Sequence, residues 1–147
     1  MAIEVKILGA ADDSALSNIA ASVFDKPIDP QLATEFLTDP RHHIAIAIED
    51  GLVVGFVSAV HYVHPDKPTE LWINEVAVAP SHHRRGIGQC TLRAMLGHGR
   101  ALGCQQAWVL TNRSNEAAVA LYSSVGGTTG ASDEVMFTFD LEAGGVG

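Results

Sequence analysis

The sequence predicts a mixed α/β fold, an α+β arrangement in which helices cover both faces of a central mixed sheet. Segments that alternate apolar and polar residues, as strands do, are interspersed with segments of helical 3.6-residue periodicity. A run rich in valine and alanine passes through a glycine-containing turn at 79–88 directly into a helical pattern. A second helical pattern at 115–125 is followed by another alternating segment at 134–141.

The first third of the chain predicts one strand and two helices. Alternation over 3–7 indicates the strand. Asp29 followed by Pro30 has the cap and first-turn residues of a short helix. Before it, a cap at Asp12, Asp13 or Ser14 predicts a helix whose apolar residues share one face, namely Leu16, Ile19, Ala20, Val23 and Phe24.

The rest of the chain predicts a sheet interrupted by two helices. Apolar segments at 44–49 and 52–63 flank the turn Glu49-Asp50-Gly51 and indicate a hairpin, and 71–78 supplies the next strand. A helix over 86–102, ended by Gly103, precedes a strand at 104–111. The helix at 115–125 precedes a last strand at 134–141, in which Val135, Phe137 and Phe139 alternate.

Composition favours a single domain that spans residues 1–147. The chain is 47% hydrophobic and 18% charged, which supports a sizeable core, and only the tail at 143–147 is expected to fray. No apolar run approaches the roughly 18 residues of a membrane span, and the first residues lack the basic-then-apolar order of a signal peptide. We therefore expect a cytoplasmic protein with no membrane partner.

Cysteine and histidine spacing predicts neither a disulfide nor a metal site. Cys90 and Cys104 have no ligand spacing, so we expect buried free thiols. The adjacent pairs His42-His43 and His82-His83 have side chains that diverge on a strand or helix, and neither forms an HExxH-type arrangement.

Net charge bears on the substrate. The formal charge is −8, and the few cations cluster partly in the glycine-containing turn, so the remaining surface is strongly acidic. Such a surface repels nucleic acid and acidic substrates and favours a cationic one. Solubility alone is the alternative explanation of the acidic balance.

The run from Asn74 to Gln89 predicts an anion site. At a strand-to-helix junction the first N–H groups of the helix have no intrahelical partner and carry the positive end of the helix dipole. Glycine at 86 and 88 lets an anion approach the amides, because a side chain would hold it away. The alternative is a capped helix whose Arg84 and Arg85 face water.

This run resembles motif A of the GCN5-related N-acetyltransferases (GNAT), a Val-x-Val strand followed by Arg/Gln-x-x-Gly-x-Gly/Ala that holds the pyrophosphate of acetyl-CoA. His83 stands where the family has Arg or Gln. The resemblance implies acetyl-CoA as cofactor and a central sheet whose strands splay to admit it. It implies cofactor contacts from Val76, Ala77, Val78, His83, Arg84, Arg85, Gly86, Ile87, Gly88 and Gln89.

The segment 115–127 resembles motif B of the same family, Asn-x-x-Ala-x-x-Leu-Tyr-x-x-x-Gly-Phe, with Gly127 at the closing Phe. In the family this helix flanks the pantetheine arm, which implies cofactor contacts from Asn115, Ala118 and Tyr122. From the residues alone, an amphipathic helix capped by Asn115 and ended by Gly126 explains the segment as well.

Acetyl transfer to an amine requires a base, donors to the carbonyl oxygen and a proton for the leaving thiolate. Glu75 is the candidate general base, directly or through one water, with a pKa tuned by partial burial. The backbone N–H groups of Val76 and Val78 are the family's donors. Tyr122 would protonate the thiolate. The alternatives are a surface carboxylate at Glu75 and a core tyrosine at Tyr122.

The stretch 44–140 further resembles the type I aminoglycoside 3-N-acetyltransferases, in Ala-Val-Ala-Leu-Tyr at 118–122, Glu-Val-Met at 134–136 and Pro-x-Glu at 68–70. Those enzymes have Asp where this chain has Glu75. The resemblance implies transfer to the 3-amino group of an aminoglycoside, whose ammonium groups need carboxylates. The candidates are Glu75, Glu116, Asp133 and Glu134, with Asp25 or Asp29 in addition.

Other possibilities stay open for the acceptor and for the assembly. Trp72 and Trp108 either face a sugar ring or pack in the core. The same machinery would serve another amine, such as a polyamine, an amino acid or a protein N-terminus. A non-catalytic acetyl-CoA-binding module is the alternative from another class. We also expect a homodimer.

Overall fold

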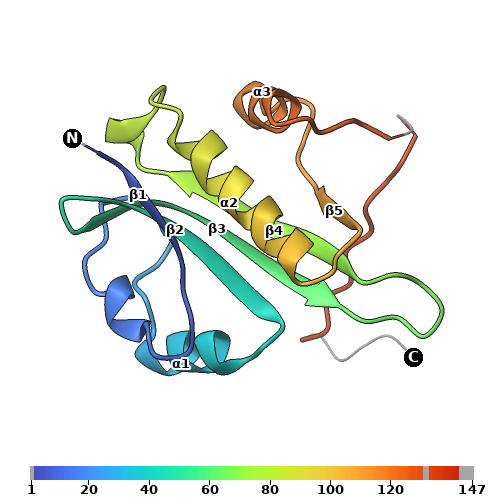
Figure 1. Cartoon of the computed structure of the whole chain (residues 1–147). Coiled ribbons are helices and arrows are strands. Elements are labelled where there is room, and N and C mark those ends of the chain that lie inside the picture. Colours follow the sequence, from blue (N-terminus) through green and yellow to red (C-terminus); the bar gives the residue numbers. More distant parts are fainter. Residues whose placement is uncertain (1, 131–132, 143–147) are drawn as a thin grey trace.

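The computed structural model describes residues 2–130 and 133–142, and its five strands form one mixed sheet. The strands lie in chain order from β1 to β5 (Figure 1). The first three neighbouring pairs are antiparallel, and β4 and β5 are parallel. Their bounds are β1 Glu4–Ile7, β2 His42–Glu49, β3 Leu52–Tyr62, β4 Glu70–Val78 and β5 Gln106–Val109.

Three α-helices and two 3₁₀ turns accompany the sheet. Asp29 caps α1, Pro30–Thr38, because its carboxylate accepts from the N–H groups of Gln31 and Leu32. The other elements are the 3₁₀ turns η1, Asp13–Leu16, and η2, Pro80–His82, with the helices α2, Ile87–Ala101, and α3, Glu116–Ser124. Among the described helices, none has the length and apolarity needed to cross a bilayer.

Helices cover both faces of the sheet, as the sequence predicts. Strand alternation sends Ile44 and Ile46 to one face, where they join the core cluster that includes Leu37 of α1. Ala45 lies on the other face, in the cluster with Leu92 and Met95 of α2. Figure 1 shows α2 crossing the sheet, with α1 below β1 and β2. The mixed α/β fold is therefore confirmed.

The helix predicted to begin at residues 12–14 and reach Phe24 is wrong. Only η1 forms, and Ser22 has a left-handed φ of 68°, which no α-helix contains. The backbone bonds the sheet instead, since Val53 donates to Asn18 and Ala20 donates to Val53. The apolar residues still pack inward, because the Phe24 ring stacks on Phe56 with centroids 4.1 Å apart. Periodicity located the buried side chains but not the backbone partners.

The strand predicted at 134–141 is also wrong. The segment has no strand pairing, and its large apolar side chains are exposed, from 73% at Val135 to 87% at Leu141. Alternation predicts which residues share a face of a strand, but it supplies no neighbouring strand. The tail predicted to fray, 143–147, lies outside the described residues.

A gap opens in the pairing of β4. Its ladder with β5 runs from Glu70 opposite Gln106 to Ile73 opposite Val109 and then stops, although β4 continues to Val78. On the other side β4 stays paired with β3, with a bulge between Ser58 and Ala59. The second half of β4 therefore has backbone groups that no strand on the β5 side satisfies among the described residues. This is the splay that the sequence resemblance implies.

Candidate functional site

The turn before α2 has the geometry of an anion site. Gly86 is the N-cap residue of α2 with a left-handed φ of 76°, and Arg84 has a φ of 64°. Within the described residues, the N–H groups of Ile87, Gly88 and Gln89 have no hydrogen-bond acceptor. Three free amides at the N-terminus of a fifteen-residue helix attract a phosphate.

The two glycines serve different purposes. A side chain at Gly86 would meet only the far end of Gln89, at 4.0 Å, but its positive φ disfavours any other residue. A Cβ at Gly88 would lie 3.3 Å from the Leu121 side chain of α3. Gly88 therefore permits close packing of α2 on α3, a role that the spacing of the motif did not reveal.

The polar side chains of the turn contact protein groups. His83 donates from Nε2 to the carbonyl oxygen of Val78 at 3.0 Å. The guanidinium of Arg85 binds the carboxylate of Glu49, and Gln89 donates to Ser124 of α3 at 3.0 Å. The turn thus offers an anion its free amides, while His83, Arg85 and Gln89, which are predicted at the cofactor, bind neighbouring protein groups.

Helix α3 begins and ends as its sequence predicts. The side chain of Asn115 accepts from the N–H of Ala118 at 3.1 Å and caps the helix. At the other end, Gly126 adopts a φ of 97° and Gly127 donates to the carbonyl of Tyr122 at 2.9 Å, which is a Schellman motif. A Cβ at Gly127 would lie 2.8 Å from that oxygen, so this chain cannot accommodate the family's Phe there without a shift.

Glu75 lies on the half of β4 that has no β5 partner, and on the other side it is paired with Ser58 of β3. Its side chain stays accessible to solvent, yet partial desolvation raises the pKa of its carboxyl above the ordinary value. The negative charge of Asp25 raises that pKa further. A carboxylate with a raised pKa at an accessible position is suited to accept a proton from an ammonium group.

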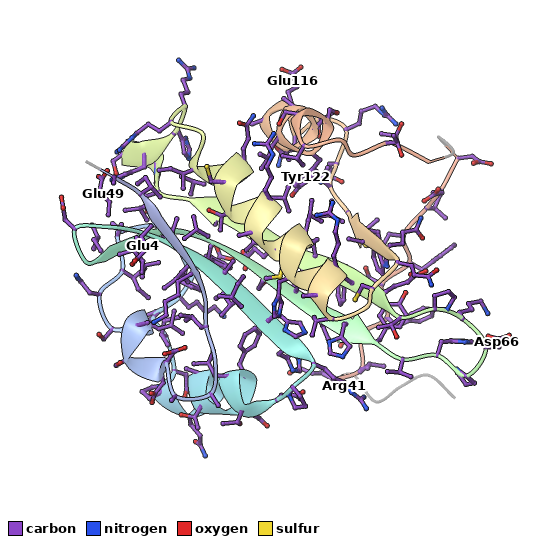
Figure 2. All side chains as sticks on the ribbon, in the orientation of Figure 1. Glu4, Arg41, Glu49, Asp66, Glu116 and Tyr122 are labelled. Carbon is purple, nitrogen blue, oxygen red and sulfur yellow. The ribbon has the colours of Figure 1, made fainter. Side chains whose placement is uncertain are left out.

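Tyr122 lies on the inner side of α3, whereas Glu116 points away from the sheet (Figure 2). Burial raises the pKa of the Tyr122 phenol, so the hydroxyl stays protonated at neutral pH, as a proton donor must. Tyr122 also lines a cavity of about 280 Å³ between α2, β5 and α3. Neither Glu75 nor the turn at 86–88 lines that cavity, so we do not identify it with the reaction centre.

The predicted acceptor carboxylates are not gathered by any contact. Glu116 is in the first turn of α3, and Asp133 and Glu134 lie in the exposed segment after it. Of the acids named above, Asp25 does act on Glu75, because its negative charge raises the pKa of the Glu75 carboxyl.

An aromatic pair lies elsewhere on β4 and β5. Trp72 and Trp108 stack with ring centroids 5.5 Å apart, and Trp108 is 36% exposed. Tyr62 accepts from the indole of Trp108 at 3.4 Å and donates to Glu70. The two rings therefore pack on each other and Trp108 bonds Tyr62, while part of Trp108 stays accessible to solvent.

Both cysteines are free, but the expectation of burial is wrong for Cys90. It is exposed on α2, because the buried face of that helix is formed by residues such as Thr91 and Met95. Cys104 is partly buried, and desolvation raises the pKa of its thiol. Within 2–130 and 133–142, no three histidine, cysteine or acidic side chains are arranged to hold a metal ion.

Three histidines instead form a hydrogen-bonded row from β2 and β3 to α2. Nε2 of His43 lies 2.7 Å from Nδ1 of His61, and Nδ1 of His43 lies 3.0 Å from Nε2 of His98. His43 is 7% exposed, and burial, followed by the charges of His98 and His61, lowers its pKa to about 4. Because both ring nitrogens of His43 bond neighbours, the row cannot converge on one ion.

This row predicts a loss of stability in acid. His43 stays neutral in the folded state down to about pH 4 but takes a proton in the unfolded chain near pH 6.5, so stability falls as pH falls between those values. From pH 7 to pH 5 the free energy of unfolding should drop by about 2 kcal/mol through this group. Urea titrations at both pH values should show a smaller drop for His43→Gln. Equal drops in the two proteins would contradict this assignment.

A sheet strand that loses its neighbour and then leads through a turn into a helix N-terminus with free amides is typical of α/β proteins that bind phosphate-bearing ligands. The chain belongs to the acetyltransferase (GNAT) family, whose model matches residues 14–126. Acetyl-CoA is the cofactor of this family, and the residues present fit it. The free amides of α2 suit its pyrophosphate, and the unpaired backbone of β4 suits its amide-bearing arm.

Curated relatives match part of their own length. An uncharacterised N-acetyltransferase of Mycobacterium tuberculosis (strain ATCC 25618 / H37Rv) is 27% identical over 106 residues, which are 72% of this chain and 65% of that protein. The L-2,4-diaminobutyric acid acetyltransferase of Nocardia farcinica (strain IFM 10152) is 29% identical over 86 residues, 58% of this chain and 44% of that enzyme. The chain thus spans less than two thirds of the length of these relatives.

Solved structures share the fold. An aminoglycoside acetyltransferase, meta-AAC0020 from an uncultured soil metagenomic sample, in complex with sisomicin, has a TM-score of 0.80 at 16% identity. The match covers 94% of this chain and 95% of that one. Aminoglycoside N-acetyltransferase AAC(6')-Iy in complex with CoA has a TM-score of 0.73 at 18% identity, with 95% of each chain covered. At these identities the likeness concerns the fold.

Proposed function

We propose that this protein transfers the acetyl group of acetyl-CoA to a primary amine, the 3-amino group of an aminoglycoside. When bound, acetyl-CoA supplies an activated thioester. Glu75, directly or through one water, takes the proton that the amine loses as its nitrogen bonds the carbonyl carbon. Backbone N–H groups at Val76 and Val78 donate to the carbonyl oxygen, and Tyr122 gives a proton to the sulfur as the C–S bond breaks.

The unpaired second half of β4 is the observation on which the proposal depends. Glu75 and strand backbone without a β5 partner lie on this half of β4, and the chain runs from its end through η2 to the free amides of α2. A general base and unpaired donors are two of the three groups that acetyl transfer to an amine requires, the third being the proton donor to the thiolate. The raised pKa of Glu75 and the protonated phenol of Tyr122 support their assigned roles.

A cationic acceptor is supported by charge. The formal charge is −8, and Asp25 is close enough to Glu75 to raise its pKa, so two acids act together beside the splay. Each charged hydrogen bond from an ammonium group contributes about 1 to 3 kcal/mol when partly desolvated. The aminoglycoside acetyltransferases among the structural neighbours support this acceptor class.

A second acceptor class has its own support, because one relative is named for L-2,4-diaminobutyric acid. That acceptor would use the same base and the same turn before α2, the cofactor turn at 83–89, with a smaller cleft. A protein amine is the third possibility, and a relative from Escherichia coli (strain K12) is named as an acetyltransferase of a ribosomal protein alanine.

A panel of amines read out by free-thiol release from acetyl-CoA separates these acceptors. We expect turnover with kanamycin-like or gentamicin-like compounds and an apparent affinity that falls as salt rises, because charges across a solvated cleft are screened within about 8 Å at physiological ionic strength. The sequence resemblance implies acceptor contacts from Glu116 and Glu134, and on that assignment Glu116→Gln and Glu134→Gln should raise the acceptor KM and leave acetyl-CoA binding unchanged. Thiol release equal to the no-acceptor background would refute the aminoglycoside assignment, and turnover of diaminobutyrate or of a peptide would replace it.

The cytoplasmic location and the homodimer expected from the sequence stay part of the proposal. The dimer has support in the exposed apolar side chains of 135–141 and in β5, which pairs only with β4 among the described strands. Sedimentation of the purified chain as a monomer at micromolar concentration would contradict the dimer.

A further inference from the structure

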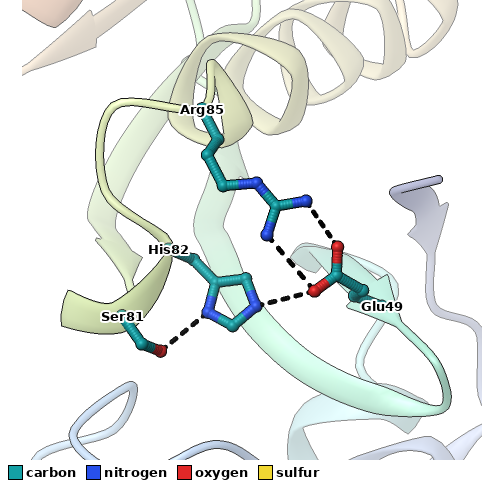
Figure 3. A network of polar contacts seen from close by, with 4 residues as sticks. All are labelled: Glu49, Ser81, His82 and Arg85. Carbon is teal, nitrogen blue, oxygen red and sulfur yellow. Dashed lines mark hydrogen bonds and ion pairs between the residues drawn. The ribbon is translucent and has the colours of Figure 1, made fainter. Parts of the chain in front are cut away.

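The β2–β3 hairpin is bound to the cofactor turn by one carboxylate. Glu49, the last residue of β2, accepts from both terminal nitrogens of Arg85, at 3.2 and 2.5 Å (Figure 3). The same carboxylate accepts from Nε2 of His82 at 2.9 Å, and Nδ1 of His82 lies 2.8 Å from the Ser81 hydroxyl. The side chains of Glu49 and His82 are each only 14% exposed.

We propose that Glu49 is a positioning residue for acetyl-CoA binding: it clamps His82 and Arg85 and thereby fixes the backbone between them. The proposal rests on the acetyl-CoA site described above. Glu49 needs no contact with the cofactor, since it acts through the turn that holds the free amides of α2.

Backbone geometry explains why the turn needs such a clamp. Between His82 and α2 the chain contains two left-handed residues, Arg84 at 64° and Gly86 at 76°. A left-handed residue other than glycine costs about 1 to 2 kcal/mol and persists only where its surroundings hold it. Glu49 binds the residue on each side of His83-Arg84, so one carboxylate restrains both ends of the strained segment.

The negative charge that the clamp needs is present at physiological pH. The hydrogen bonds from Arg85, and then from His82, lower the pKa of the Glu49 carboxyl to about 2. The carboxylate therefore stays charged wherever the enzyme would work. A bidentate pair with a guanidinium also fixes orientation as well as distance, which a lysine in place of Arg85 would not do.

The order serine, histidine, carboxylate also resembles a nucleophile relay, but two observations argue against one. Arg85 already compensates the charge of Glu49, which a relay would use to stabilise the imidazolium. The amides of His82 and His83, which follow Ser81, donate to the carbonyls of Ala79 and Pro80. They are therefore not available to stabilise an oxyanion at Ser81.

The clamp and simple electrostatics predict opposite results. Removing a negative charge near an anion site should strengthen acetyl-CoA binding if Glu49 acts only through its charge. If Glu49 acts as a clamp, Glu49→Gln should weaken binding by about tenfold, on the order of one charged hydrogen bond. Calorimetric titration with acetyl-CoA gives the affinities of the wild type and of Glu49→Gln and so distinguishes the two outcomes. Unchanged or tighter binding by Glu49→Gln would overturn the proposal.

Asp50→Asn is the matched control, because it removes the same charge from the next residue of the hairpin. Asp50 is exposed, and its φ of 52° is one that asparagine tolerates. We expect Asp50→Asn to bind acetyl-CoA as tightly as the wild type or slightly more tightly. A weakening equal to that of Glu49→Gln would assign the effect to charge or to the hairpin as a whole and would overturn the clamp.

A double-mutant cycle tests the pair itself. Arg85→Ala should weaken binding as Glu49→Gln does, and the double variant should bind no more weakly than the weaker single variant. The KM for acetyl-CoA should rise in each, with kcat and the acceptor KM unchanged. Additive losses would show that the two residues act separately and would contradict the proposal.

Trypsin provides a readout that does not depend on acetyl-CoA. Arg84 and Arg85 lie in an exposed turn, and cleavage there requires the turn to open locally. Without ligand, Glu49→Gln should be cut after these residues several-fold faster than the wild type or Asp50→Asn, with melting temperatures that show all three are folded. Equal cleavage would overturn the clamp, whereas faster cleavage in a protein that binds no acetyl-CoA would refute the proposed function alone.

Discussion

Replacing Glu75 by glutamine is expected to lower turnover at neutral pH by about 10²-fold, the range that a positioned general base contributes. Glutamine keeps the shape of the side chain but cannot take a proton. The affinity for acetyl-CoA should change little, because the free amides that would bind it are at the start of α2 and Glu75 is on β4. Thiol-release kinetics and calorimetry on the same preparations give both values. Wild-type turnover in Glu75→Gln would remove Glu75 from the mechanism.

The pH profile gives this prediction a matched control. A general base works deprotonated, so kcat/KM should fall as pH falls through the raised pKa of Glu75. Asp25→Asn removes the nearby negative charge, which should lower the pKa of Glu75 and move that limb to lower pH without abolishing turnover. A profile that is the same in wild type and Asp25→Asn would show that the limb belongs to another group.

Gly86→Val is expected to abolish measurable acetyl-CoA binding. Valine is strained at a φ of 76°, and its side chain would stand at the N-cap of α2 beside the free amides. Arg84→Ala should weaken binding far less, because backbone amides supply most of the site. Calorimetry on both variants tests the ranking, with melting temperatures as a check on folding.

Gly88→Ala separates the two glycines of the turn. The added methyl group would lie 3.3 Å from Leu121, so we expect a loss of stability through the α2–α3 contact. For Gly86→Val, in contrast, an acetyl-CoA affinity equal to that of the wild type would contradict the assignment of the cofactor turn.

The sequence predicts well those parts of the fold that depend on one residue type at one local backbone position. Gly86 and Gly103 mark the ends of α2, and Asn115 caps α3. In each case a residue type meets a local backbone need, so neighbouring residues suffice to predict it.

The predictions from sequence fail where hydrogen bonds to a distant part of the backbone determine the local structure. The segment from Leu16 to Phe24 has a helical pattern, but its backbone pairs with Val53, more than 30 residues away, and Ser22 adopts a left-handed φ. The alternating segment at 134–141 has no strand beside it among the described residues. Side-chain periodicity indicates which residues are buried, but it does not indicate which other segment supplies hydrogen-bond partners to the backbone.

The sequence predicts the motif residues of the candidate site but not the residue that contacts the turn from another strand. The turn at 86–88, Glu75 and Tyr122 follow from sequence, whereas Glu49 lies 33 and 36 residues from His82 and Arg85. In the sequence Glu49 is only the first residue of a hairpin turn. Its role appears when β2 ends beside the start of α2, a contact that no local spacing encodes.

The acetylated product is the most direct test of acetyl transfer to an amine nitrogen. The protein is incubated with acetyl-CoA labelled at the acetyl carbonyl carbon and with a kanamycin-like acceptor, and the product is examined by NMR. We predict one new amide at the 3-amino nitrogen, formed in an amount equal to the thiol released and reduced by about 10²-fold in Glu75→Gln. Thiol release without any labelled amide would contradict amine acetylation and show that the acetyl group goes to water or to a hydroxyl group instead.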